Sequence, residues 1–231
     1  MDYKKEAAQK AAELIQNNIV IGFGAGTAMA HMVGFLKEKV EAGLSVKILT
    51  SSFTTRMLLL QNNFEVLDTA SVSSFDIYFD GCDQFDKNLN ALKSGGGIHT
   101  NEKVLAVMAN EFILVGDDSK YVDKLEVKFP IVIEVLPQIV SYLPLVIKKI
   151  YPGVKTELRL SNKKDGAVIS DNGNYIFDLW FDEFPDLASI NPTLKNIPGV
   201  IETSLFYNIA KRGVIAGEKG VRVLEKQWIC S

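Results

Sequence analysis

The sequence predicts an α/β protein that has a mostly parallel sheet and a smaller α+β domain after it. Strand patterns alternate with helix patterns up to about residue 115, which is typical of βαβ units. After Pro130 the pattern changes to closely spaced strands, a hairpin turn and two helices. The 231 residues, 47% hydrophobic and 23% charged, suit one large domain with a smaller one appended.

The first half begins with an amphipathic helix over residues 3–17, in which apolar residues recur at helical spacing until Asn17 and Asn18 stop it. A short buried strand, 19–24, then runs into glycines. The remaining patterns predict helices at 28–41, 54–62 and 100–110 and strands at 46–50, 64–67, 75–80 and 111–115.

The second half is predicted to fold into antiparallel hairpins beside two helices. Strands are expected at 131–135, 156–160, 167–170, 175–180 and 200–205, helices at 137–151 and 186–196, and a turn at 171–174. Residues 214–216 and 220–224 are expected to return to the first sheet. The predicted domains are therefore 1–128 with 207–231, and 129–206.

Composition excludes several classes of function. A net charge of −3 gives no basic surface for nucleic acid. The N-terminal helix lacks the apolar centre of a signal peptide, and no run of 18 apolar residues predicts a membrane span. Cys82 and Cys230 form neither a disulfide framework nor a zinc pattern, so we expect two reduced thiols in a cytoplasmic protein.

Two turns that follow strands could bind an anion. Residues 22–27, Gly-Phe-Gly-Ala-Gly-Thr, allow close backbone approach at the start of a helix, although neither the dinucleotide nor the Walker pattern is complete. Residues 50–55 offer hydroxyls and N–H groups at the carboxyl end of a strand. The structural alternatives are a tight turn and a helix cap by Ser52 or Thr54.

The strand at 75–80 ends in two carboxylates, Asp80 and Asp83, separated by Gly81 and Cys82. A pair of acids at the carboxyl edge of a buried strand indicates general acid–base chemistry, whereas a solvated turn would account for only one of them. Metal binding is the weaker alternative, because neither His31 nor His99 lies at a convincing ligand spacing.

Three consecutive glycines, 95–97, follow Lys93 and Ser94 and precede the helix that carries Glu102. Such a run costs backbone entropy and is seldom kept without a close-approach role. Taken singly, Lys93 could be a surface charge and Glu102 a residue that complements the helix dipole. Together with the two aspartates they indicate a site, to which Lys120, after the strand at 111–115, adds another cation.

These motifs, in this order, resemble the type A ribose-5-phosphate isomerase family over nearly the whole chain. The resemblance rests on Gly-x-Gly-x-Gly, Thr-Ser-Ser, Asp-Gly-x-Asp, Lys-x-Gly-Gly-Gly, Glu102-Lys103, Ser119-Lys120, residues 170–174 and residues 197–200. It implies a Rossmann-like domain with a ferredoxin-like domain, assembled as a homodimer or homotetramer. It also implies the interconversion of ribose 5-phosphate and ribulose 5-phosphate in the pentose phosphate pathway, without metal or cofactor.

The resemblance assigns a role to each motif. Glu102 would take a proton from C2 and return it to C1, Lys93 and the glycines after it would stabilise the enediolate oxygen, and Asp80 and Asp83 would hold hydroxyls and help to open the sugar ring. Ser94, Gly95 and Gly96 would also contact the substrate. The implied contacts with the sugar phosphate are Ala25, Gly26, Thr27, Ala28, Ser51, Ser52, Gly81, Cys82, Lys120 and also Lys5.

The chain departs from the family pattern at several positions. Ala25 and Ala28 stand where hydroxyl residues are usual, and Gln84, Ser94, Asn101 and Cys82 also differ. Each missing hydroxyl removes about 1 kcal/mol of binding. Two alternatives therefore stay open: a paralogue that isomerises another sugar phosphate, and a non-catalytic sugar-phosphate sensor.

Overall fold

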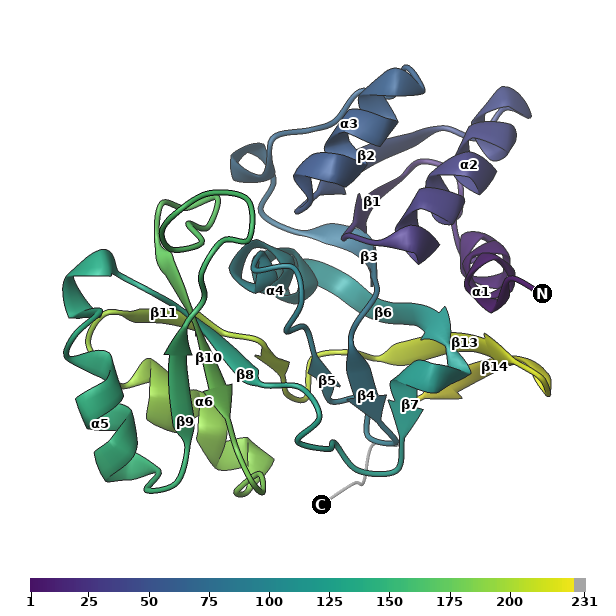
Figure 1. Ribbon diagram of the computed structural model, residues 1–231. Coiled ribbons are helices and arrows are strands. Elements are labelled where there is room, and N and C mark those ends of the chain that lie inside the picture. Colours follow the sequence, from purple (N-terminus) through teal and green to yellow (C-terminus); the bar gives the residue numbers. More distant parts are fainter. Residues whose placement is uncertain (227–231) are drawn as a thin grey trace.

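The computed structural model describes residues 1–226, and its largest sheet has six strands in the order β14-β13-β6-β3-β1-β2 (Figure 1). The strands β2, β1, β3, β6 and β13 are parallel, and β14 pairs antiparallel with β13. The predicted parallel sheet is confirmed. Its strands are β1 (Ile19–Phe23), β2 (Val46–Thr50), β3 (Phe75–Asp80), β6 (Ala109–Asp117), β13 (Arg212–Gly217) and β14 (Gly220–Glu225).

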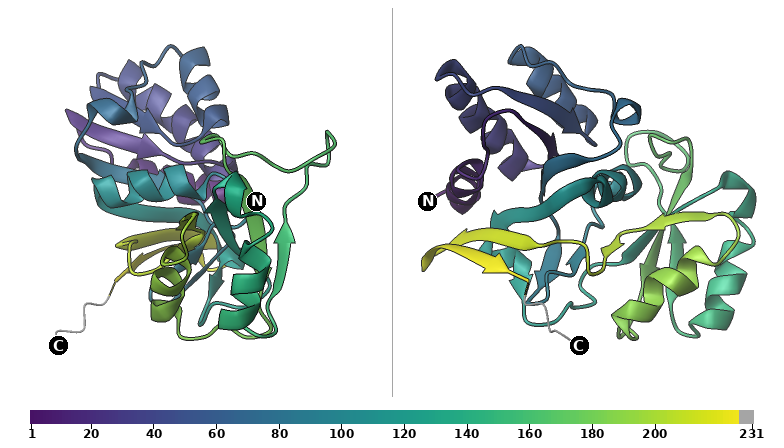
Figure 2. Two further views of the ribbon diagram at one scale, coloured as in Figure 1. Left: turned by 90° about the vertical axis from the view of Figure 1, so that its left-hand side faces the viewer. Right: turned by 180° about the vertical axis from the view of Figure 1, so that it is seen from behind.

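Helices cover both faces of this sheet (Figure 2). They are α1 (Tyr3–Ala12), α2 (Thr27–Glu41), α3 (Phe53–Gln61) and α4 (His99–Met108). Side chains of α1 and α2 share one apolar cluster with Phe79 of β3. The next residue back, Tyr78, faces the other side and packs with Leu105 and Ala106 of α4. The alternation of side chains along β3 thus places α4 on the face opposite α1 and α2.

A second, antiparallel sheet has the order β11-β8-β10-β9. Its elements are β8 (Ile131–Val135), α5 (Leu143–Ile150), β9 (Lys155–Leu158), β10 (Tyr175–Trp180), α6 (Leu187–Lys195) and β11 (Val200–Thr203). The chain order β-α-β-β-α-β is that of the ferredoxin-like fold. Both helices pack on the sheet through one apolar cluster, and the ferredoxin-like expectation is confirmed.

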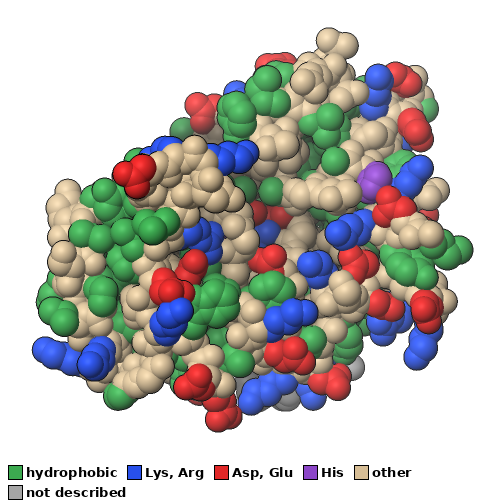
Figure 3. Space-filling model, in the orientation of Figure 1, with side chains coloured by type: hydrophobic (Ala, Val, Ile, Leu, Met, Phe, Trp, Pro, Cys, Tyr) green, Lys and Arg blue, Asp and Glu red, His purple; other side chains and the backbone are tan. Residues whose placement is uncertain are grey.

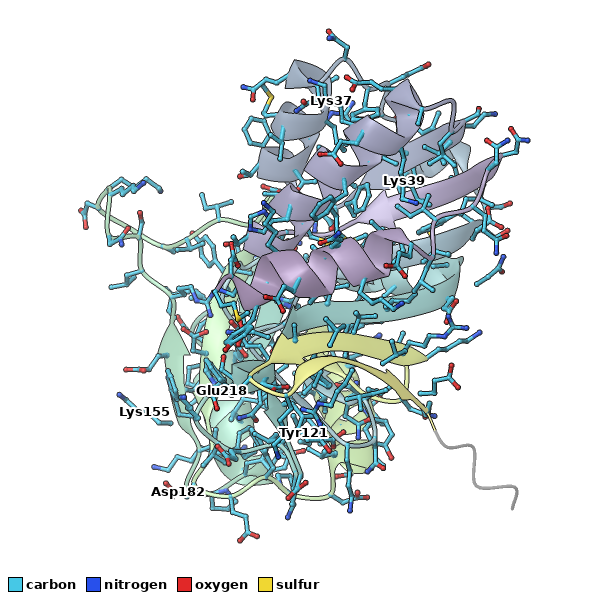
Figure 4. All side chains as sticks on the ribbon, turned by 90° about the vertical axis from the view of Figure 1, so that its right-hand side faces the viewer. Lys37, Lys39, Tyr121, Lys155, Asp182 and Glu218 are labelled. Carbon is cyan, nitrogen blue, oxygen red and sulfur yellow. The ribbon has the colours of Figure 1, made fainter. Side chains whose placement is uncertain are left out.

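A third, small sheet lies between the two larger ones (Figure 1). Its order is β12-β5-β4-β7, from β4 (Gln84–Asp86), β5 (Ala91–Leu92), β7 (Tyr121–Val122) and β12 (Leu205–Phe206). Tyr121 joins this sheet to the β13–β14 hairpin (Figure 4), because its ring lies 5.6 Å from that of Phe85 and 5.6 Å from the Arg222 guanidinium. Strands of two or three residues carry no readable periodicity, so the sequence did not predict this sheet.

Five predicted elements differ in the structure. The strand predicted at 200–205 is divided between β11 (Val200–Thr203) of the second sheet and β12 (Leu205–Phe206) of the third. The strand at 64–67 is reduced to one bridge, Ile48 to Val66, and that at 167–170 to bridges at Ala167 and Ile169. The first helix ends at Ala12. The helix at 137–151 is a 3₁₀ turn, Pro137–Ile139, followed by α5, because Pro144 lacks the N–H that a continuous helix needs.

The domain boundaries at 128/129 and 206/207 stay a prediction, and Cys230 lies outside the described residues. Over residues 1–226, the helices are too short or too polar for any of them to cross a membrane.

Candidate active site

The candidate site is a cavity of about 340 Å³ at the carboxyl edge of the parallel sheet. Open α/β sheets bind ligands at this edge. In Figure 3, acidic and basic side chains gather around a hollow near the middle of the face shown. The lining residues are Lys4, Ala25, Gly26, Thr27, Ala28, Gly81, Cys82, Asp83, Lys93, Gly96, Glu102, Val115, Gly116, Asp117 and Lys120. Eleven of them are residues that the sequence singled out.

Asp80 ends β3 and is fully buried beneath the cavity. Its Oδ1 accepts hydrogen bonds from the backbone N–H of Ala25 at 3.1 Å and of Gly81 at 2.7 Å, and its Oδ2 accepts one from the Tyr78 hydroxyl at 2.9 Å. A Cβ on Gly24 would lie 1.9 Å from the Asp80 carboxyl carbon. The carboxylate therefore requires a glycine in the turn after β1.

Lys93 is the cation at the centre of the site. Its Nζ lies 2.8 Å from Asp80 Oδ2 and 3.2 Å from Glu102 Oε1, and it donates to the Gly81 carbonyl at 2.5 Å. Burial by itself would lower the pKa of Lys93, but Asp80 and Glu102 outweigh it and raise that pKa above its ordinary value. Lys93 is therefore a fixed positive charge at neutral pH.

Glu102 lies in the first turn of α4 and is 4% exposed. Leu105 and Ala106, three and four residues on, pack on the sheet, so the same face of the helix carries Glu102 towards Lys93. Burial, the largest influence, raises the pKa of Glu102, and Lys93 only partly opposes it. A carboxyl group with a raised pKa is a stronger base than an exposed one, which suits proton abstraction near neutral pH.

Asp83 connects the aspartate pair to the glycine run. Its Oδ2 accepts hydrogen bonds from the backbone N–H of Ser94 at 2.6 Å and of Gly95 at 2.8 Å. Asp83 and Gly96 line the cavity, whereas Ser94 and Gly95 stand behind it. The strand end and the glycine run are thus held together as one wall.

A second group of residues lines the cavity at the start of α2. Gly26 has a φ of +99°, a conformation that favours glycine, and Thr27 and Ala28 begin the helix. Lys120 and Lys4 add two cations, and Lys4 Nζ lies 3.9 Å from Asp117 Oδ2. Helix N-terminal N–H groups beside lysines make an environment suited to an anion.

The structure places Lys4 at the cavity rather than Lys5, the lysine named from the sequence. Neighbouring helical residues point about 100° apart, so only one of the two can face it. Val115, Gly116 and Asp117 also line the cavity, although from this part of the chain only Lys120 was predicted as a site residue. The sequence pattern could have indicated them, because these residues end β6 at the same edge of the sheet as Asp80.

Ser51 and Ser52 do not line the cavity. The Ser51 hydroxyl lies 2.8 Å from the Tyr78 hydroxyl, which in turn donates to Asp80. Ser52 caps α3 by accepting a hydrogen bond from the Thr55 N–H at 3.2 Å. Their contact with a substrate stays a prediction, and the alternative of a helix cap by Ser52 is what the structure shows.

Two residues near the site are electrically neutral at pH 7. Burial raises the pKa of the Cys82 thiol to about 12, so this lining residue is a thiol and not a thiolate. Burial lowers the pKa of His99 to about 4, and its Nε2 lies 3.3 Å from the carbonyl oxygen of Glu202 on β11. His99 is therefore part of the packing between α4 and β11 and does not line the cavity.

Metal ligands do not cluster in residues 1–226, which hold no group of three or more His, Cys, Asp or Glu side chains able to bind an ion.

Comparison with known proteins places this chain in a family. The family described as ribose 5-phosphate isomerase A (phosphoriboisomerase A) matches residues 47–220. The ribose-5-phosphate isomerase A of Thermosynechococcus vestitus is 37% identical over 90% of this chain and 88% of that protein. The enzyme of Pyrococcus horikoshii is 35% identical over 97% of this chain and 98% of its own.

Two solved structures of ribose-5-phosphate isomerases have the same fold as this chain. The ribose 5-phosphate isomerase A of Methanocaldococcus jannaschii superposes with a TM-score of 0.90 at 34% identity, covering 96% of this chain and 98% of that one. A D-ribose-5-phosphate isomerase in complex with phospho-erythronic acid superposes with a TM-score of 0.91 at 35% identity, covering 97% of this chain and 100% of that one. On sequence, fold and length alike, this chain belongs to the ribose 5-phosphate isomerase A family.

Proposed function

We propose that this protein is an aldose–ketose isomerase that interconverts ribose 5-phosphate and ribulose 5-phosphate, with Glu102 as the base. The observation that carries the proposal is the pairing of a buried carboxyl group with a buried ammonium group, Glu102 Oε1 and Lys93 Nζ, 3.2 Å apart on the wall of one cavity. Family membership supports the same reaction.

The proposed reaction moves one proton between neighbouring carbons. Glu102 takes the C2 proton of the open-chain aldose, the C2–H electrons form a C1–C2 double bond, and the former carbonyl oxygen becomes an enediolate oxygen. A proton then passes from the C2 hydroxyl to that oxygen, and Glu102 returns its proton to C1, which leaves a carbonyl at C2. The base and the stabilised oxyanion are the two requirements of such a step.

The remaining groups have supporting roles in this proposal. Lys93 and the backbone of Gly96 stabilise the enediolate oxygen, and Asp83, assisted by Asp80 beneath it, holds sugar hydroxyls and assists ring opening. Lys4, Lys120 and the N-terminus of α2, which also line the cavity, bind the phosphate. The predicted homodimer or homotetramer and the predicted cytoplasmic location stay predictions.

One observation favours a second candidate, an isomerase that acts on another aldose phosphate. Ala25 and Ala28 line the cavity, so two positions against the substrate offer no hydroxyl. Each absent hydrogen bond would weaken the binding of ribose 5-phosphate by about 1 kcal/mol. The space without hydroxyls could instead fit a sugar with a different hydroxyl pattern.

A coupled assay of the purified protein against pentose and hexose phosphates tests the proposal. We expect ribose 5-phosphate to have the highest kcat/KM of the panel. A higher kcat/KM for another aldose phosphate would select the second candidate. Binding of ribose 5-phosphate by calorimetry, with no turnover of any sugar phosphate, would show that the protein is a sensor and overturn the enzymatic proposal.

A further inference from the structure

We propose that Arg159 is a positioning residue for the active site, although it belongs to the ferredoxin-like part of the fold and does not line the cavity. Arg159 follows β9, and its guanidinium donates to two backbone carbonyls of the glycine run: Nη2 to Ser94 O at 2.8 Å and Nη1 to Gly95 O at 3.1 Å. The expected changes in kcat rest on the proposed function, whereas the expected changes in hydrogen exchange do not.

The same two residues, Ser94 and Gly95, are held from their other side by the site itself. Their N–H groups donate to Asp83 Oδ2, at 2.6 and 2.8 Å. The segment is therefore clamped between a carboxylate that accepts hydrogen bonds from its N–H groups and a guanidinium that donates hydrogen bonds to its carbonyl oxygens. A planar guanidinium fork can bond two carbonyls at fixed spacing, which a lysine cannot do.

The clamp matters because, beside it, the described contacts of Ser94 and Gly95 add one hydrogen bond, from the Ser94 hydroxyl to the Pro130 carbonyl oxygen at 2.6 Å. Gly95 and Gly96 are exposed and have no side chain to pack. Glycine loses more conformational freedom on ordering than any other residue, so an unsupported run of three would be mobile. Lys93 immediately precedes the clamped segment, and Gly96 of the cavity wall immediately follows it.

Arg159 is itself fixed to the ferredoxin-like sheet. Its Nε donates to Asp178 Oδ2 at 3.1 Å, and Nη2 also bonds to Asp178 Oδ1. Asp178 lies in β10, which is paired on both sides by β8 and β9. The side chains of Arg159 and Asp178 are 19% and 16% exposed, so the pair is well shielded from solvent. Through this pair the ferredoxin-like sheet sets the position of the active-site loop.

The test compares Arg159→Gln, Arg159→Lys and Asp178→Asn with wild type on ribose 5-phosphate. We expect Arg159→Gln to lower kcat about 10- to 100-fold with KM changed less than about threefold, because misplacement of catalytic groups costs up to about 100-fold. Arg159→Lys, which keeps the charge but lacks the fork, should lower kcat about tenfold. The Arg159→Gln/Asp178→Asn double variant should fall no further than Arg159→Gln alone, because Asp178 acts through Arg159.

The matched control is Arg212→Gln. Arg212 also pairs with a carboxylate, Glu111 at 2.9 Å, but it begins β13 at the end of the sheet opposite the cavity. Its kinetics should match those of wild type. A kcat for Arg159→Lys within twofold of wild type, or additive losses in the double variant, would overturn the inference.

A readout independent of catalysis separates this inference from the proposed function. Amide hydrogen exchange at Ser94 and Gly95 should be at least about tenfold faster in Arg159→Gln than in wild type or Arg212→Gln. Unchanged exchange would overturn the clamp even in an active enzyme. An inactive wild type that shows the exchange difference would overturn the reaction and leave the clamp established.

Discussion

At the scale of single residues, the site depends on how closely one carboxylate approaches the backbone. Asp80 receives two N–H groups, a tyrosine hydroxyl and the Lys93 ammonium group. These bonds compensate the cost of burying its charge, which would otherwise be several kcal/mol. They are geometrically possible only because Gly24 leaves the space beside the carboxylate empty.

We therefore predict that Gly24→Ala disrupts the site. The added Cβ would lie 1.9 Å from the Asp80 carboxyl carbon, so the backbone or the carboxylate must move. Overpacking of this kind costs about 2 kcal/mol of unfolding free energy, and turnover should fall with it. Urea unfolding and the coupled assay measure the two effects.

Gly34→Ala is the matched control, because Gly34 lies in α2 and an added Cβ there meets nothing within 4 Å. It should raise the unfolding free energy by up to about 1 kcal/mol through helix propensity, with kcat unchanged. Equal stability of the two alanine variants would contradict the requirement for glycine at position 24.

Much of this detail could be predicted from residue types and much could not. Two acids at a strand end, a glycine run and a glutamate on the next helix predicted which loops meet, because the carboxyl ends of parallel strands share one edge. The sequence could not show that Asp80 lies beneath the cavity or that Arg159 reaches Ser94 from 65 positions away. These facts depend on side-chain direction and on contacts between the sheets.

At the scale of elements, the helix that carries Glu102 is anchored by the ferredoxin-like sheet. Lys103, the next residue of α4, is almost fully buried, and its Nζ donates to Glu202 Oε1 at 2.9 Å, Thr203 O at 2.5 Å and Thr203 Oγ1 at 3.2 Å. Burial lowers the pKa of Lys103 to about 8, against the opposing charge of Glu202. The position of α4 thus depends on β11.

Lys103→Met should destabilise the protein by about 3 kcal/mol, because it removes the buried cation from Glu202 and leaves two oxygens of Thr203 without their lysine donor. Lys195→Met is the control, since Lys195 bonds to the same Glu202 at 2.6 Å but is 45% exposed. An exposed pair of this kind contributes less than about 1 kcal/mol. Chemical denaturation of both variants checks the difference, and a larger loss in Lys195→Met would refute it.

Element length decided which elements could be predicted. The long strands of both large sheets and the helices α2 and α4 have enough residues for a period to be read. The strands at 84–86, 91–92, 121–122 and 205–206 do not, although they join the two large sheets. Pro144, by contrast, was a readable break inside the predicted helix at 137–151.

At the scale of the whole molecule, the two large sheets meet through α4, β11 and the third sheet, and a buried histidine lies in that contact. His99 is fully buried, and its Nδ1 has no hydrogen-bond partner among the described residues. Burial lowers the pKa of His99 from 6.5 to about 4. Between these values the unfolded chain binds a proton that the folded protein does not.

The contribution of His99 to stability should therefore fall as the pH falls through this window, while Glu102, whose pKa is raised in the folded protein, contributes in the opposite direction. Linkage gives about 2 kcal/mol of unfolding free energy lost through His99 between about pH 7 and about pH 5. His99→Gln should remove that part of the pH dependence, whereas His31→Gln, at the chain's other histidine, should retain it. Denaturant titrations at the two pH values measure the difference, and an unchanged pH dependence in His99→Gln would exclude the histidine as its source.

The most direct test of the account is the turnover of Glu102→Gln, which replaces the carboxyl group by an amide of the same shape. Glu38→Gln, on the exposed side of α2, makes the same chemical change far from the cavity. The account predicts that Glu102→Gln binds ribose 5-phosphate but loses at least about 100-fold in kcat, the low end for a positioned general base, while Glu38→Gln keeps wild-type turnover. Near-normal turnover by a folded Glu102→Gln would contradict the assignment of Glu102 as the base.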